Sequence, residues 1–214
     1  MLKKRLLGVF AHPDDEGVIG GALLHYSMFG VETGLICATR GEVGEIADPA
    51  LATPENLGQV REGEMQAAAE VLGIHSLWFL DYRDSGMAGT PENEDPRSLA
   101  QASALDVVSK LVAIIRQFRP QVMVTFDETG GYGHPDHIAI YKHTTSAFHA
   151  AVRGEAWVTR PAGDARTGLV VRRGSLLNEI AAPSPRGEGS ASSMVGTQDQ
   201  GPSSQSGSKR EAPV

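Results

Sequence analysis

The sequence predicts an α/β fold in which helices cover both faces of a mostly parallel sheet. The first 150 residues alternate between short apolar runs and longer amphipathic runs. The short runs are apolar throughout, which is typical of parallel strands buried between two layers of helices. We therefore expect a three-layer sandwich over residues 1–152.

Each expected element follows from its own pattern. The strands are short apolar runs, and the helices are longer runs with apolar residues at helical spacing. Gly30 and Gly73 end two helices, because glycine readily takes the left-handed conformation that follows a helix. Pro120 ends a third, since proline disfavours helical backbone in the residue before it. In chain order we expect strand Leu6–Ala11, helix Val18–Phe29, strand Leu35–Thr39, helix Arg61–Leu72, strand Leu77–Leu80, helix Ala102–Phe118, strand Val122–Phe126 and helix Ile138–Ala150.

The composition changes after about residue 153. More than half of residues 183–214 are Ser, Gly or Pro, and such a segment cannot bury enough apolar surface to offset its ordering entropy. We expect a disordered, low-complexity tail over 183–214. Residues 153–182 are ambiguous, although Leu169–Val171 and Leu176–Leu177 could form short elements.

Charge and cysteine content restrict the partners and the compartment. The net charge is −7 and the pI about 5.5, so the chain lacks the basic surface of a protein that binds nucleic acid or anionic membranes. Cys37, the only cysteine, lies in an apolar run that predicts a buried, inert thiol. The apolar run near the N-terminus stops at Ala11, and no later run has the length of a membrane span. We expect a cytoplasmic protein without an integral membrane segment.

Two short clusters carry the candidate chemistry. His12-Pro13-Asp14-Asp15-Glu16 follows the first expected strand, and His134-Pro135-Asp136-His137 follows the fourth. In an open parallel sheet, ligands bind beyond the carboxyl ends of the strands, where the strand order reverses. We therefore expect both clusters to line one crevice.

The residue types in these clusters suit a catalytic metal. Two histidines and a carboxylate with an open position make a catalytic zinc site, and His12, Asp15 and His137 supply that set. Ferrous iron accepts the same ligands. Asp14 remains beside the metal as a candidate general base, and His134 can donate to a developing oxyanion or to a leaving amine.

Structural interpretations compete with these functional ones. An aspartate before a helix is often an N-cap, and Asp15 and Asp136 could be only that. Histidines are more often structural than metal ligands, and we expect that of four: His25, His75, His143 and His149. Gly17, Gly20 and Gly21 loosely resemble a dinucleotide-binding loop, but the spacing differs and three acidic residues precede them. Close packing of helix on strand is the better interpretation of these glycines.

The paired motifs resemble a known family, the LmbE-like or PIG-L type zinc deacetylases. AHPDDE (residues 11–16) and GGYGHPDH (residues 130–137) are similar to its two signatures, and the resemblance covers roughly residues 5–150. It implies a Rossmann-like fold and hydrolysis of N-acetylglucosamine-type conjugates. It also implies zinc bound by His12, Asp15 and His137. The remaining implied roles are a general base at Asp14, an oxyanion donor at His134 and a histidine-orienting carboxylate at Asp136.

Further positions resemble substrate contacts in deacetylases and amidases of the mycothiol pathway. These are Arg61, Asp84 and Tyr132, for which the structural alternatives are a helix-start arginine, a turn aspartate and a loop aromatic. The long polar loops at 40–60 and 84–98 are candidate pocket walls. We expect the partner to be a small amino-sugar conjugate; the oligomeric state is left open.

The chain departs from the family after the last motif. Family members continue with further strands and a helix, whereas residues 153–214 look unrelated, as if truncated or altered. Two alternatives to the deacetylase therefore stand: a thiol-conjugate amidase with the same metal core, and a truncated remnant that binds metal without turnover.

Overall fold

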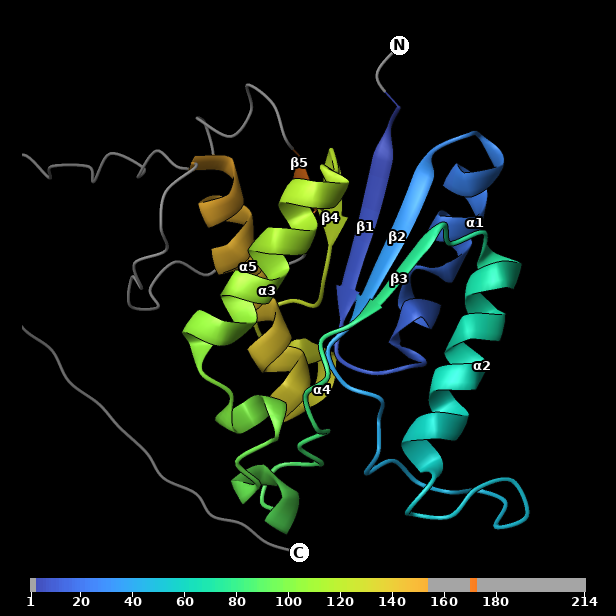
Figure 1. Cartoon of the computed structure of the whole chain (residues 1–214), viewed down its shortest axis with the longest axis vertical. Coiled ribbons are helices and arrows are strands. Elements are labelled where there is room, and N and C mark those ends of the chain that lie inside the picture. Colours follow the sequence, from blue (N-terminus) through green and yellow to red (C-terminus); the bar gives the residue numbers. More distant parts are fainter. Residues whose placement is uncertain (1–2, 154–169, 173–214) are drawn as a thin grey trace, which may run out of the picture. The chain divides into compact units, whose positions relative to one another are not determined.

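The computed structural model describes residues 3–153 and 170–172, which contain a sheet with the strand order β3-β2-β1-β4-β5 (Figure 1). The first four strands are parallel, and β5 pairs antiparallel with β4. The mostly parallel sheet is therefore confirmed. The strands are β1 (Arg5–Phe10), β2 (Glu32–Cys37), β3 (Ser76–Phe79), β4 (Val122–Val124) and β5 (Val170–Arg172).

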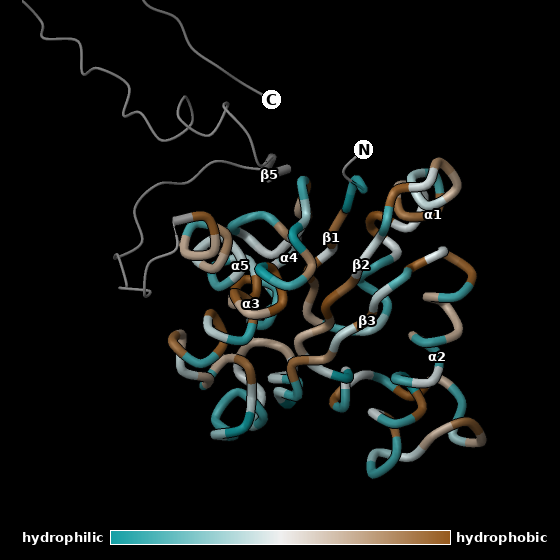
Figure 2. The backbone as a smooth tube through the Cα atoms, turned by 45° about the horizontal axis from the view of Figure 1, so that its top comes forward, coloured by the Kyte–Doolittle hydropathy of each residue, from teal (hydrophilic) through white to brown (hydrophobic). Residues whose placement is uncertain are grey.

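Helices cover both faces of this sheet, which confirms the three-layer sandwich. Helices α1 (Gly20–Met28) and α2 (Leu57–Leu72) lie on one face, and α3 (Ala104–Phe118) and α5 (Pro135–Arg153) on the other (Figure 1). The two central strands β1 and β2 are largely hydrophobic between these layers (Figure 2).

Alternate residues of β1 reach different cores. Leu7 and Val9 belong to the core shared with α3 and α5, whereas Phe10 belongs to the core shared with Met65 of α2. Because successive side chains of a strand point to opposite faces, a strand covered on both sides must be apolar at every position. Cys37 is fully buried, as expected, and burial raises the pKa of its thiol well above the usual value.

The interpretation of the early glycines was wrong. A Cβ atom at Gly17 or Gly21 would meet nothing within 4 Å, and one at Gly20 would make only ordinary contacts. A close approach of helix and strand occurs at Gly34 of β2 instead, where a Cβ would lie 3.0 Å from the ring of Phe118 on α3. Gly34 therefore lets β2 and α3 pack closely.

Several boundaries differ from the expected ones. Helix α2 begins at Leu57 rather than Arg61, because a turn closed by the Thr53 N–H donating to Asn56 Oδ1 (2.6 Å) precedes it. Helix α5 begins at Pro135 rather than Ile138, since proline suits the first turn of a helix. β4 ends at Val124 rather than at the expected Phe126.

Short helical turns occupy the loops that sequence patterns left irregular. The expected helix over Val18–Phe29 is divided, because Val18 belongs to a separate 3₁₀ turn. β5 overlaps the possible element at Leu169–Val171, while Leu176–Leu177 and the tail 183–214 lie outside the described residues. The turns are η1 (Asp15–Val18), η2 (Pro91–Glu94), η3 (Leu99–Gln101) and α4 (Gly130–Gly133).

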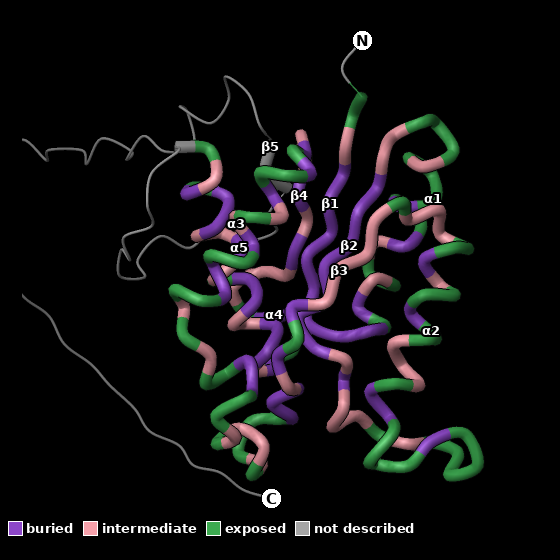
Figure 3. The backbone as a smooth tube through the Cα atoms, viewed as in Figure 1, coloured by how far each residue is buried: buried purple, intermediate pink, exposed green. Residues whose placement is uncertain are grey.

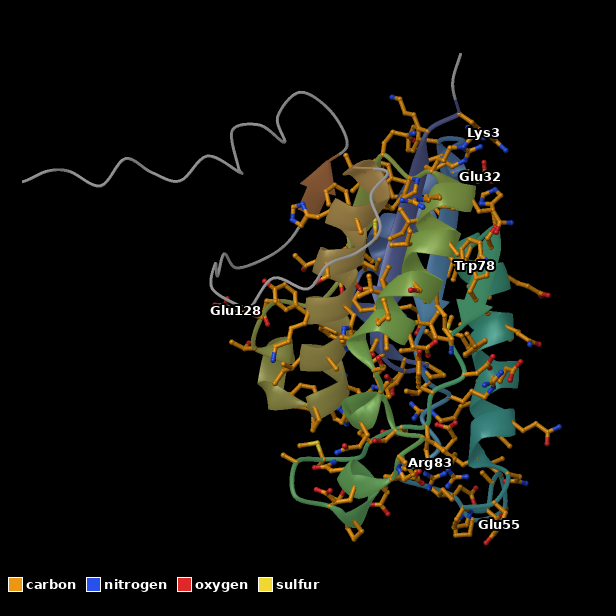
Figure 4. The ribbon with its side chains drawn as sticks, turned by 60° about the vertical axis from the view of Figure 1, so that its left-hand side comes forward. Lys3, Glu32, Glu55, Trp78, Arg83 and Glu128 are labelled. Atoms are coloured by element: carbon orange, nitrogen blue, oxygen red, sulfur yellow. The ribbon has the colours of Figure 1, made fainter. Side chains whose placement is uncertain are left out.

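The strand order reverses between β1 and β4, and this defines where a ligand can bind. β2 lies on one side of β1 and β4 on the other, so a crevice is expected beyond their carboxyl ends. Arg83, in the loop that follows β3, lies toward the end of the molecule where the strands have their carboxyl ends (Figure 4). The ion pair of Lys3 and Glu32 (3.6 Å) lies at the other end of the sheet. No helix of the described residues is long and apolar enough to cross a membrane.

Candidate metal centre

The first motif forms a tight turn directly beyond β1. The backbone remains buried past the strand end, at Ala11 and His12 (Figure 3). Asp15 Oδ2 accepts the N–H groups of Ala11 (3.1 Å) and His12 (2.8 Å). These amides precede Asp15, so its carboxylate is not an N-cap of the turn that follows. The two bonds fix the carboxylate and turn its other oxygen toward His137.

The second motif places His137 at the start of α5, beyond β4. Its Nδ1 lies 3.1 Å from the carbonyl oxygen of Gly130. A carbonyl can only accept, so Nδ1 carries the proton and Nε2 keeps its lone pair. The Phe126 ring stacks on the imidazole at 3.9 Å between centroids and 9° between planes. Together these contacts fix the rotation of the ring.

One nitrogen of His12, one nitrogen of His137 and the two carboxylate oxygens of Asp15 lie close together. His12 Nδ1 lies 3.2 Å from His137 Nε2 and 3.5 Å from Asp15 Oδ2, while Asp15 Oδ1 lies 3.3 Å from His137 Nε2. Zinc bonds of about 2.0–2.2 Å at tetrahedral angles separate neighbouring ligand atoms by about 3.3–3.6 Å. The three residues therefore fit a zinc ion in type, and each pairwise distance is close to the spacing that zinc ligands have.

The far nitrogen of His12 faces two carboxylates. His12 Nε2 lies 3.2 Å from Asp136 Oδ2 and 3.6 Å from Asp84 Oδ1. An ionised carboxylate only accepts, so Nε2 carries a proton and Nδ1 is left for the metal. A metal-binding histidine commonly donates its other ring N–H to a carboxylate in this way. Asp136 thus contacts His12 with its carboxylate, and its sequence neighbour His134 only through the backbone.

Two groups of three residues each offer ligand atoms that all lie within 4.8 Å of one another, and neither group includes Asp15. They are His12–His134–His137 and His12–Asp84–Asp136. We favour His12, Asp15 and His137, because His12 Nδ1 and His137 Nε2 lie 3.2 Å apart and each faces an oxygen of the Asp15 carboxylate at 3.3–3.5 Å. Both oxygens of Asp84 and of Asp136 accept hydrogen bonds from the protein. In Asp15 the two backbone N–H groups bind Oδ2, and Oδ1 faces His137.

The charges of Asp15 and His12 stabilise one another. Burial opposes ionisation of Asp15, but hydrogen bonds to His12 and His137 outweigh it and hold the carboxyl pKa well below its usual value. Burial also opposes protonation of His12. Its hydrogen bonds to Asp136, Asp15 and Asp84 outweigh that effect and raise its pKa. Buried carboxylates that need positive charge nearby suit a divalent cation.

His134 lies beside His12, and its pKa is shifted in the opposite direction. Its Nδ1 accepts the backbone N–H of Asp136 at 3.2 Å, so in the neutral ring the proton is on Nε2. Burial, and then the charge of His12, lower the pKa of His134. A neutral imidazole with its proton on Nε2 donates a hydrogen bond from that nitrogen but is only a weak acid.

Asp14 is the exposed member of the first motif. Its φ of 104° is left-handed, which is uncommon outside glycine and is frequent at functional sites. Arg61 secures this conformation: its Nη2 donates to Asp14 Oδ2 and to the Pro13 carbonyl, each at 2.6 Å, and its Nη1 donates to the Gly41 carbonyl at 3.1 Å. Asp14, Arg61 and Glu64 line a cavity of about 160 Å³.

The two other predicted substrate contacts have different surroundings. Tyr132 is 69% exposed, and its ring centroid lies 5.1 Å from that of His137, so it stands at the edge of the centre. Asp84 is buried and accepts the N–H groups of Gly86 (2.8 Å) and Val43 (3.3 Å). The substrate role of Asp84 stays a prediction.

Sequence patterns missed three residues of the centre. Ser85 binds the Asp136 carboxylate, Phe126 stacks on His137, and Gly130 supplies the carbonyl that orients His137. Only Gly130 left a usable signal, since a glycine pair beside a histidine motif often marks close backbone approach.

The approach at Gly130 gives a testable expectation. A Cβ there would lie 2.7 Å from His137 Cβ and 2.9 Å from Ile138 N, at a φ of +64°. We expect Gly130→Ala to displace His137 and to reduce zinc affinity at least about tenfold, as loss of an orienting partner typically does.

Gly131→Ala is the matched control for Gly130→Ala. Gly131 also has a positive φ (+72°), but a Cβ there meets nothing within 4 Å. It should lower the free energy of unfolding through backbone strain while zinc affinity is kept. Zinc titration and thermal unfolding of the two variants test this, and equal zinc affinity in both would contradict it.

An α/β sandwich with a buried histidine–aspartate centre at its strand-order reversal is a common class of ligand-binding and catalytic domain. Comparison with protein-family models identifies the family within it. Residues 7–148 match PIG-L, GlcNAc-PI de-N-acetylase, and the chain belongs to this family.

Comparison with curated proteins agrees with this family assignment, because the relatives are named as deacetylases. The chain is 45% identical over 158 residues to the 1D-myo-inositol 2-acetamido-2-deoxy-α-D-glucopyranoside deacetylase of Geodermatophilus obscurus. It is 42% identical over 174 residues to the enzyme of that name from Thermobifida fusca. These alignments include 69% and 75% of this chain but 54% and 61% of the relatives. The chain thus spans little more than half their length.

Solved structures also share the fold. The N,N'-diacetylchitobiose deacetylase of Pyrococcus horikoshii matches with a TM-score of 0.56 and 26% identity, over 69% of this chain and 50% of that one. GalB, the 4-carboxy-2-hydroxymuconate hydratase of Pseudomonas putida, matches with a TM-score of 0.52 and 25% identity, over 74% and 63%. The fold therefore accommodates more than one reaction, and function must be argued from the site.

Proposed function

We propose that the chain is a metal-dependent hydrolase that removes the acetyl group from the amide nitrogen of an N-acetylglucosamine-type conjugate. The observation that carries the proposal is the set of pairwise distances of 3.2–3.5 Å that join His12 Nδ1, His137 Nε2 and the carboxylate oxygens of Asp15. The activity for which the deacetylase relatives are named supports the substrate class. Zn²⁺ is the proposed ion, and Fe²⁺ is the alternative that the same ligands accept.

The centre supplies the parts that amide hydrolysis needs. Zinc held by His12, Asp15 and His137 would act as a Lewis acid toward the amide carbonyl and would lower the pKa of a water molecule. Asp14 is proposed to accept the proton of the attacking water, because it is an exposed carboxylate directly before the proposed ligand Asp15 in the sequence. Its bonds to Arg61 hold its side chain in place.

His134 is proposed to stabilise the oxyanion or to assist the leaving amine. Its Nδ1 accepts a backbone N–H, so the Nε2–H is the group available to a developing negative charge. Asp136 holds His12 in the tautomer that offers Nδ1 to the metal. Arg61, Tyr132 and Asp84 remain the proposed substrate contacts.

The proposal is tested with the full chain loaded with zinc. Release of free amine and of acetate would be measured over a panel of N-acetylglucosaminides that includes N-acetylglucosaminyl-inositol. We expect turnover that a chelator abolishes and added zinc restores. Cleavage only of larger acyl groups from a thiol conjugate would instead show an amidase. Stoichiometric zinc without any turnover would show a metal-binding remnant.

His134 offers a second test of the mechanism. Replacing His134 by alanine should lower kcat by about 10²–10³, as removal of an oxyanion donor typically does, with zinc content and KM little changed. His75→Ala is the control, because His75 lies in another part of the fold, where its Nδ1 accepts the Thr33 N–H at 3.3 Å. Unchanged kcat in His134→Ala would remove His134 from the reaction.

A further inference from the structure

Ser85 lies beneath the metal centre, in the loop that follows β3, and is fully buried. Its backbone N–H donates to Asp136 Oδ2 at 2.9 Å, and its hydroxyl donates to Asp136 Oδ1. The backbone N–H of Ala100 donates to the same hydroxyl at 2.9 Å. Because an ionised carboxylate can only accept, the hydroxyl directs its proton to Asp136 while its oxygen accepts from Ala100.

The Asp136 carboxylate is completely buried, and hydrogen bonds to Ser85 and His12 hold its two oxygens. Ser85 binds both of its oxygens, and Oδ2 also accepts from His12 Nε2 at 3.2 Å. A buried carboxylate without partners would be costly, so these donors also keep it in its position. The orientation of Asp136 in turn decides which nitrogen of His12 carries the proton.

We infer that Ser85 is a positioning residue of the metal centre, acting through Asp136 on His12. It touches neither the proposed metal nor the substrate. It holds the carboxylate that keeps the proton on His12 Nε2, so that Nδ1 faces Asp15 and His137. The inference rests on the proposed function to the extent that a metal occupies this centre.

Ser85→Ala removes the hydroxyl but keeps the backbone N–H that also holds Asp136. We expect zinc affinity to fall about tenfold, at the lower end of the effect of removing an orienting partner. The visible absorption bands of the Co²⁺-loaded protein, which report ligand geometry, should also shift. Both are measured by titrating the metal-free full chain with the metal alone, so neither depends on activity.

Ser98→Ala is the matched control. Ser98 is equally buried, its backbone pairs with that of Arg83 at the start of the same loop, and its hydroxyl accepts the Gln101 N–H at 3.4 Å. Ser98→Ala likewise removes a buried serine hydroxyl, but that hydroxyl contacts η3 and not Asp136. It should lose stability to a similar extent while zinc affinity and the Co²⁺ bands stay those of the wild type.

The outcomes separate the inference from the proposed function. Wild-type affinity and bands in Ser85→Ala would overturn the inference, and so would equal losses in Ser85→Ala and Ser98→Ala. If Ser85→Ala does not fold, ¹⁵N spectra of the zinc-loaded wild type decide: zinc on His12 Nδ1 with a proton on Nε2 supports the inference, and zinc on Nε2 overturns it. If the wild type binds no metal, it is the proposed function that fails.

Discussion

Replacing His137 by alanine is expected to abolish both zinc binding and turnover. His137 is one of the three proposed protein ligands, and its Nε2 lies within 3.3 Å of donor atoms on the other two. Metal catalysis is worth several kcal/mol, and each 1.4 kcal/mol is a factor of ten, so we expect at least about a 10³-fold loss of kcat/KM. Metal content after dialysis and turnover of the zinc-supplemented variant measure this.

The same result is expected for His12→Ala and Asp15→Ala. His25→Ala is the control: His25 lies exposed on α1, where its ring packs against Phe29 at 4.8 Å between centroids. Thermal unfolding of the metal-free proteins shows whether each variant is folded. Full zinc content in all three folded ligand variants would refute the ligand assignment.

The parts of the centre that sequence could predict are those encoded within a few residues. His12 and Asp15 adjoin the end of one strand and His137 follows another, so the parallel topology alone brings them together. The apolar runs predicted that topology because β1 and β2 are buried on both faces. Helix boundaries were less predictable, since they depend on local bonds such as Thr53 N–H to Asn56.

The parts that could not be predicted depend on pairings between distant segments. Ser85 and Asp136 are 51 positions apart, and Arg61 and Asp14 are 47 apart. Nothing in either local sequence marks these pairs, because hydroxyl–carboxylate and guanidinium–carboxylate contacts are common to most surfaces. The identity of the free nitrogen on each histidine is also a tertiary property, set here by Gly130 and Asp136.

Asp14 and Asp15 show how far adjacent residues of one type can diverge. Asp15 is buried and bonded to backbone amides, whereas the side chain of Asp14 is 72% exposed and paired with Arg61. The left-handed backbone at Asp14 turns the chain so that the two carboxylates point in different directions. This divergence supports separate roles, with Asp15 as metal ligand and Asp14 as general base.

Asp14→Asn should therefore keep zinc and lose turnover. Asparagine has the size of aspartate and tolerates left-handed backbone, and its side-chain oxygen can still accept from Arg61. Only the basic carboxylate is removed. General base catalysis is worth about 10²–10⁴-fold, and we expect kcat to fall within that range at unchanged zinc stoichiometry.

Asp81→Asn is the control for Asp14→Asn, because the chain offers a close match. Asp81 also has a positive φ (62°), has a side chain that is 68% exposed and pairs with an arginine, Arg40, at 2.7 Å. Asp81→Asn also removes one negative charge from a residue with left-handed backbone. Asp81 is not part of the proposed metal centre, so kcat should stay at the wild-type value. An Asp14→Asn variant with full zinc and undiminished kcat would refute the mechanism. One that loses zinc instead would show that Asp14, and not Asp15, is the metal ligand.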